Sequence, residues 1–234
     1  MTAKLDLVLK ELKSMEDPSC VAGMAAYGIR SEKTYGVSMT KLIAMKKRIG
    51  KDHDLAAGLW KSGIHDARLL ACLIDDPKLV TESQMDNWVK DFDNWAICDG
   101  CCGHLFDRTP FAYQKAREWT ARREEFVRRA GFSMIAALTV HDKKADDQSF
   151  LQFLPAIRKA ATDQRTYVMK AVNWALRQIG KRNPRLNREA IRVAEQIRKM
   201  DTKSAKWIAS DALRELRSDP VKARFQRMKD RSLH

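Results

Sequence analysis

Long apolar runs are missing from this 234-residue chain. No stretch approaches the roughly 18 apolar residues that span a bilayer, so we expect no membrane partner. The N-terminal segment MTAKLDLVLKELKSMED mixes acidic and basic residues and has no continuous apolar core, which argues against a signal peptide. We therefore expect a cytoplasmic protein.

Strand-like alternation is also missing, and glycine and proline are scarce, with 10 and 6 residues. Apolar residues instead recur with the period of a helix, as at Leu5, Leu9 and Leu12. Residues that favour helix ends frame these segments, such as Gly50 at an end and Thr81 at a start. The sequence predicts an all-α protein. Helices are expected over 5–15, 39–50, 65–77, 81–92, 109–119, 123–140, 148–161, 164–184, 187–200 and 202–220, before a last short basic helix.

Similar segments return at intervals of about 35–45 residues, the repeat length of helical solenoids. WALRQI at 174–179 resembles DALREL at 212–217, and FVRRAGFSMI at 126–135 aligns with YVMKAVNWAL at 167–176, a spacing of 41. We predict a HEAT-like repeat α-solenoid with a concave basic face. It would be one domain over 1–234, with N-terminal helices in 1–50 and a short basic tail at 220–234. An irregular bundle with chance similarities is the alternative.

Acidic residues are depleted in the last third of the chain. The formal net charge is +14, and residues 151–234 hold 21 Lys or Arg against 8 Asp or Glu, an excess of 13. Such an uneven distribution indicates a basic face that meets a polyanion, with nucleic acid as the leading candidate. An anionic membrane surface is less favoured, because no segment pairs this charge with a strongly apolar opposite face.

Cysteines are few, but three of the five lie close together in FDNWAICDGCCGHLF. Cys98, Cys101, Cys102 and His104 superficially offer four zinc ligands, and Cys98 and Cys101 also have the spacing of a redox pair. A structural zinc site usually draws two ligand pairs from separate segments, and no second pair exists. The three cysteines and Leu105 would share one buried helix face, so we expect packing with reduced thiols and no metal or organic cofactor.

Trp95 and Asp99 are four residues apart in the same segment, on a neighbouring helix face. A carboxylate in such an apolar setting is hydrogen-bonded, paired or used chemically. A helix cap or a salt bridge to an arginine is the structural alternative to a functional role.

The segment DNWAICDGCC resembles the catalytic segment of the AlkD-type DNA alkylation repair glycosylases, a HEAT-like repeat family, in which a Trp precedes an Asp by four residues. Three further segments resemble the family in the same order: MAAYGIRSEKTYGVSM, FVRRAGFSM and YVMKAVNWALRQIGKRNP. The resemblance covers about residues 20–216. It departs from the pattern at Asn94, where the best-studied branch has an aromatic residue, and in the cysteine-rich CDGCCGH.

This resemblance implies a monomeric, nucleoid-associated DNA glycosylase that excises N3- or N7-alkylated purines from double-stranded DNA without a base-flipping pocket. The implied catalytic residues are Asp99, Trp95, Arg129 and Trp174. The residues expected to bind DNA are Tyr27, Arg177, Lys181, Arg182 and Arg214.

A non-catalytic solenoid that binds DNA, RNA or an acidic partner is the alternative. Asp99 would then be a structural ion-pair partner, for example of Arg129. We expect the remaining tryptophans to be structural in either case: Trp60, Trp88, Trp119 and Trp207.

Overall fold

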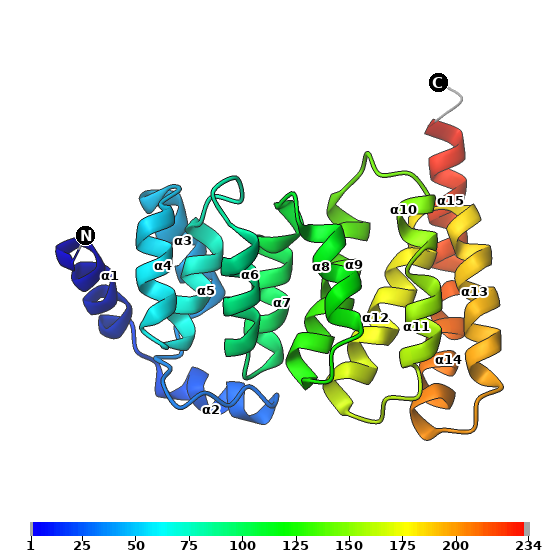
Figure 1. The fold of residues 1–234 in the computed structure, drawn as a ribbon, viewed down its shortest axis with the longest axis horizontal. Coiled ribbons are helices and arrows are strands. Elements are labelled where there is room, and N and C mark those ends of the chain that lie inside the picture. Colours follow the sequence, from blue (N-terminus) through cyan, green and yellow to red (C-terminus); the bar gives the residue numbers. More distant parts are fainter. Residues whose placement is uncertain (1, 232–234) are drawn as a thin grey trace. The chain divides into compact units, whose positions relative to one another are not determined.

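Every regular element is a helix in the described part of the computed structural model, residues 2–231 (Figure 1). This range holds fifteen α-helices, two short 3-10 helices and no strand, which confirms the all-α prediction. No helix within it is both long and apolar enough to cross a lipid bilayer. The chain forms two compact units, one ending at Ala112 and the other beginning at Tyr113.

In the first unit α5 is central and packs against α1, α3, α4 and α7. Helix ends follow local signals: Thr81 accepts a hydrogen bond from the Gln84 amide at the start of α6, and Gly50 ends α3 with a φ of 75°. The elements are α1 (Thr2–Ser14), α2 (Pro18–Ala26), α3 (Met39–Ile49), α4 (His53–Lys61), α5 (His65–Ile74), α6 (Glu82–Trp88), η1 (Val89–Asp91), α7 (Trp95–His104) and η2 (Phe106–Arg108).

A cluster of aromatic side chains lies in the core of this unit. Trp60 and Trp88 stack face to face with ring centroids 4.0 Å apart, and both are buried. Phe92 contacts Trp60 edge-on at 6.0 Å, while Phe106 lies 6.3 Å from Trp88. These contacts confirm that both tryptophans are structural.

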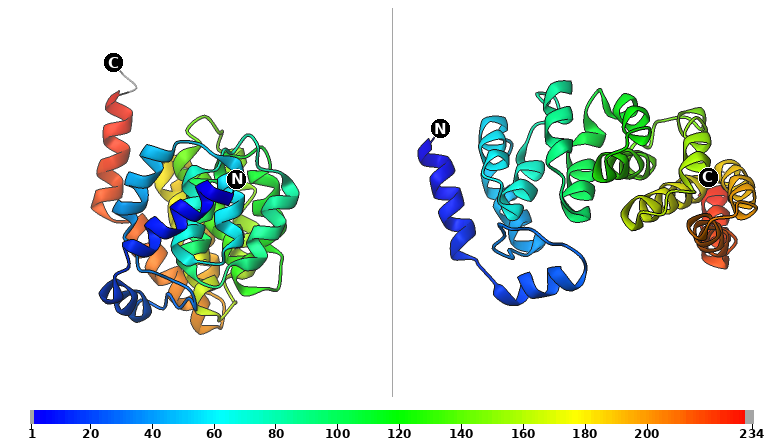
Figure 2. Two further views of the ribbon diagram at one scale, coloured as in Figure 1. Left: turned by 90° about the vertical axis from the view of Figure 1, so that its left-hand side faces the viewer. Right: turned by 60° about the horizontal axis from the view of Figure 1, so that its bottom comes forward.

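In the second unit α12 is central and packs against α9, α11, α13 and α14 (Figure 2). Gly180 permits the approach of α12 to α14, because a Cβ there would lie 2.6 Å from Leu216 Cδ2. The elements are α8 (Ala112–Thr120), α9 (Glu125–His141), α10 (Gln148–Leu151), α11 (Leu154–Ala160), α12 (Thr166–Arg182), α13 (Pro184–Arg198), α14 (Lys203–Leu216) and α15 (Asp219–Arg231). Residues 232–234 of the predicted basic tail lie outside the described range.

Contacts in the second unit follow the repeat predicted from the sequence. The rings of Phe126 and Tyr167, the first residues of two segments aligned 41 positions apart, lie 5.3 Å from each other. Asn173 on α12 donates to Asp211 on α14 at 2.6 Å, an offset of 38 positions. Equivalent helices therefore pack side by side in register.

Some local predictions were incomplete. The single helix expected over 148–161 is two helices, because Pro155 lacks an amide proton and occupies the first turn of α11, where none is needed. Helices α2 and α4 were not among the predicted helices, although an aspartate signals the start of each. Asp17 accepts hydrogen bonds from the amides of Ser19 and Cys20, and Asp52 accepts one from the Leu55 amide at 2.9 Å.

Candidate functional site

Trp95 and Asp99 lie one helical turn apart at the start of α7, where Asn94 caps the helix. The side-chain oxygen of Asn94 accepts hydrogen bonds from the amides of Ala96 at 3.0 Å and Ile97 at 3.1 Å. Trp95 is therefore the first helical residue, and the cap sets the direction in which its ring leaves the backbone.

Asn94 occupies the position where the resembled branch carries an aromatic residue. Only 1% of Asn94 is exposed, and its amide nitrogen lies 2.6 Å from an oxygen of Asp93 and 3.4 Å from Nδ1 of the buried His65. Burial lowers the pKa of His65. The residue preceding Trp95 thus points inward and adds no ring to the surface beside Trp95.

The cysteines lie on the buried face of the same helix. Cys98, Cys101 and Cys102 are fully buried, and burial raises the pKa of Cys101 and of Cys102 well above the ordinary value. Trp95 and Asp99 are partly exposed. This arrangement confirms the predicted packing role of the cysteines. Within residues 2–231, no group of three or more His, Cys, Asp or Glu side chains is arranged to hold a metal ion.

A hydrogen bond fixes the indole of Trp95. Its Nε1 donates to the backbone carbonyl of Tyr27 at 3.0 Å. Tyr27 follows the last residue of α2, and 79% of it is exposed. The first unit therefore brings together three residues that the sequence singled out: Trp95, Asp99 and Tyr27.

Arg129 lies on α9 in the second unit and is buried, with 6% exposed. Its guanidinium donates to the Tyr167 carbonyl in the first turn of α12 at 2.7 Å. This bond couples the position of α12 to that of α9. The catalytic role that the resemblance implies for Arg129 stays a prediction.

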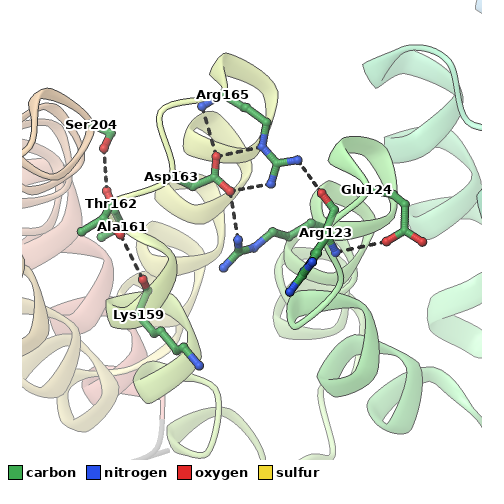
Figure 3. A network of polar contacts seen from close by, with 9 residues as sticks. Arg123, Glu124, Lys159, Ala161, Thr162, Asp163, Arg165 and Ser204 are labelled. Carbon is green, nitrogen blue, oxygen red and sulfur yellow. Dashed lines mark hydrogen bonds and ion pairs between the residues drawn. The ribbon is translucent and has the colours of Figure 1, made fainter.

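A second arginine network holds the segment that leads into α12 (Figure 3). Asp163 accepts from Arg165 at 2.6 Å and from Arg128 at 3.0 Å, and Arg165 also donates to the Arg123 carbonyl at 2.6 Å. Burial alone would raise the pKa of Asp163, but the bonds and charges of the arginines lower it overall. Ser204, at the start of α14, donates to the Ala161 carbonyl of the same segment at 2.9 Å.

Three of the predicted DNA-binding cations belong to an ion-pair network between α12 and α14. Arg177 lies 3.1 Å from Asp211 and 3.1 Å from Glu215, and Lys181 lies 2.8 Å from Glu215. Arg214 also pairs with Asp211. The carboxylates neutralise part of the positive charge of these three cations, which weakens the attraction that they can exert on a phosphate.

Arg182 contacts backbone carbonyls and an aromatic ring of the protein itself. Its guanidinium donates to the carbonyls of Thr139 and Ala145, each at 2.8 Å, and lies 4.5 Å from the ring centroid of Phe150. Trp174, on α12, is partly exposed.

The sequence model of the DNA alkylation repair enzyme family matches residues 8–216. The chain belongs to this family. A solved structure described as "a new family of proteins related to the HEAT-like repeat DNA glycosylases with affinity for branched DNA structures" matches with a TM-score of 0.76. The match covers 88% of this chain and 93% of that chain at 20% identity, so it establishes the HEAT-like repeat fold. No curated protein matches the chain.

One tryptophan of this DNA alkylation repair family member is more exposed than the sequence predicted. Trp119 is buried as predicted, with 2% exposed, but 41% of Trp207 is exposed, so Trp207 is not the core residue that was expected. Helix periodicity contained the signal: Ile208, Ala209 and Ala212 form the buried face of α14, and Trp207 lies outside that face.

Proposed function

We propose that this member of the DNA alkylation repair family is a DNA glycosylase that hydrolyses the N-glycosidic bond of N3- or N7-alkylated purines. The observation that carries the proposal is the pair formed by Trp95 and Asp99. Both are partly exposed, one turn apart, at the capped start of α7, and the Trp95 indole is held by Tyr27. The family match adds weight to a role in repair, and the chemistry remains our inference.

The substrate explains why one carboxylate suffices. An alkylated purine already carries positive charge, so it leaves as a neutral base without prior protonation. The bond from the sugar to the purine breaks and leaves an oxocarbenium-like deoxyribose, which a nearby anion stabilises. Asp99 would supply this negative charge and orient the water whose oxygen bonds to the sugar carbon while its proton is released.

The tryptophans would recognise the charge of the damaged nucleotide. An indole face attracts a cation with a free energy of about 0.5–2 kcal/mol. Trp95 would present such a face to the lesion, and no metal or organic cofactor is required. The corresponding role of Trp174 stays a prediction. Arg129 would act as a positioning residue through its bond to the Tyr167 carbonyl.

Double-stranded DNA would be held chiefly through its phosphates. The excess of 13 positive charges in residues 151–234 favours such binding and predicts an affinity that falls steeply with salt. Arg177, Lys181 and Arg214 would contribute less than unpaired cations, because Asp211 and Glu215 neutralise part of their positive charge. We further propose a monomer in the cytoplasm, associated with the nucleoid.

A non-catalytic DNA-binding protein is the second candidate. It is favoured by the description of the structurally similar protein, whose family is described as having affinity for branched DNA. Asp99 would then serve only the packing of α7.

Product analysis separates the two. The purified protein is incubated with methylated duplex DNA, and released purines and abasic sites are measured together. A glycosylase yields both in equal amounts. Asp54→Asn is a matched control for Asp99→Asn, because it removes the same charge from an exposed position on α4. Intact binding with no release by the wild type would overturn the glycosylase proposal.

A further inference from the structure

Helix α14 presents an exposed stripe that includes an aromatic ring. Lys203, Trp207, Ser210 and Arg214 follow one another at intervals of three or four residues, and all four are exposed. The opposite face of the helix is buried against its neighbours. Trp207 lies outside the buried face of α14, and 41% of it is accessible.

Helix α12 presents a parallel stripe beside it, formed by Lys170, Trp174, Arg177 and Lys181. The two helices pack together, and hydrogen bonds from Asn173 and Arg177 to Asp211 fix their register. Arg177 is one turn after Trp174 and Asp211 is one turn after Trp207, and these two residues form an ion pair at 3.1 Å, so both tryptophans belong to the same stretch of surface. We call the two stripes together the α12–α14 surface.

The charge of this surface suits a polyanion. It carries five cations, and its two carboxylates, Asp211 and Glu215, are both engaged by Arg177. Lys170 and Lys203 are exposed. An acidic protein would match the charge alone, whereas the exposed indole adds a flat face that stacks on a nucleobase.

We propose that the α12–α14 surface binds DNA where the face of a base is already exposed, at a gap, a flap or a strand end, with Trp207 stacking on that base. Within an intact duplex each base face is covered by its neighbours, so an indole gains a stacking contact only after the stack is opened. The lysines and arginines on either side would hold the flanking phosphates, which carry no sequence information. The surface therefore selects for strand interruption and not for sequence.

This inference rests on the proposed function only in taking DNA as the partner. It requires neither Asp99 nor an alkylated base, because stacking and phosphate contacts involve no bond cleavage. A protein without glycosylase activity would still show the preference.

The test compares binding to a blunt duplex with binding to the same duplex carrying a one-nucleotide gap, at fixed salt. We expect the wild type to bind the gapped DNA about tenfold more tightly. Trp207→Ala should lose this preference while its affinity for the blunt duplex changes less than twofold. Trp207→Phe should keep most of it, and thermal melting verifies that each variant is folded.

Two further variants distinguish a loss of gap preference from a general loss of DNA affinity. Lys203→Ala should weaken binding to both DNAs by a similar factor, because it removes a phosphate contact. Asp54→Asn, which removes a charge from an exposed position on α4, should bind both as the wild type does. A gap preference that survives in Trp207→Ala, or an equal loss of affinity for both DNAs in that variant, overturns the proposal.

Discussion

Trp95 donates a hydrogen bond from its indole Nε1 to the backbone carbonyl of Tyr27, 68 positions earlier in the chain, at 3.0 Å. The bond joins the first residue of α7 to the end of α2. An indole tied in this way loses little further freedom when it meets a ligand. Asp99 lies one turn along the same helix, so whatever fixes Trp95 also fixes the geometry of the pair.

Replacing Trp95 by Phe should therefore impair excision more than folding. The ring face remains, but the bond to Tyr27 is lost, at a net cost of about 1 kcal/mol in stability. We expect base release to slow about tenfold or more, since a loosely held ring must be ordered with each substrate. Tyr27→Phe is the matched control, because the acceptor is a backbone carbonyl and the phenol is not needed for the bond. An equal loss in both variants would contradict this role.

The Asn94 cap should contribute to stability through its side-chain oxygen. Asn94→Ala removes the acceptor for the amides of Ala96 and Ile97, and we expect the free energy of unfolding to fall by about 1–2 kcal/mol. Asn94→Ser removes a similar volume but restores a capping oxygen. Denaturant unfolding should show a distinctly smaller loss for Ser than for Ala. Equal losses would mean that packing at this buried position, and not the cap, determines the effect.

The buried thiols predict a loss of stability at high pH. Burial raises the pKa of Cys101 and of Cys102 above the ordinary 9.0, so unfolding releases protons once the pH exceeds that value. Their stabilising effect is fully present below pH 9.0 and is lost as the pH rises toward the folded-state pKa. Unfolding measured between neutral pH and pH 10 should show a decline that is shallower in Cys101→Ala and Cys102→Ala.

Thiol labelling gives the complementary measurement. Four of the five cysteines are buried in the native state, and only Cys20 is partly exposed. An aromatic disulfide reagent should label at most one thiol in native protein and five after denaturation. Rapid labelling of several thiols in the folded protein would show that α7 is more open than its packing indicates.

Helix periodicity was enough to predict most of the fold and part of the site. The cysteine face of α7 and the spacing between Trp95 and Asp99 follow from the geometry of one helix, so they were correctly inferred. The repeat spacing likewise predicted contacts such as that between Phe126 and Tyr167. Such features depend on residues close in sequence or on a regular offset.

Pairings across helices were not predictable in the same way. Nothing in the sequence near Arg177 indicates that its guanidinium will donate a hydrogen bond to Asp211. The sequence also does not indicate that Arg182 will donate to two backbone carbonyls. The exposure of Trp207 was missed for a different reason. Tryptophan side chains are usually largely buried, and the prediction relied on this tendency and not on the position of Trp207 around the helix. A helical-wheel projection of residues 203–216 places Trp207 outside the apolar face.

The role of Asp99 is tested most directly by single-turnover excision of 7-methylguanine from duplex DNA, with the affinity for the same DNA measured in parallel. We predict that Asp99→Asn slows base release about 100-fold or more while DNA affinity stays within a few-fold of the wild type. Release by Asp99→Asn at the wild-type rate would contradict the assignment of this carboxylate as the group that stabilises the sugar cation.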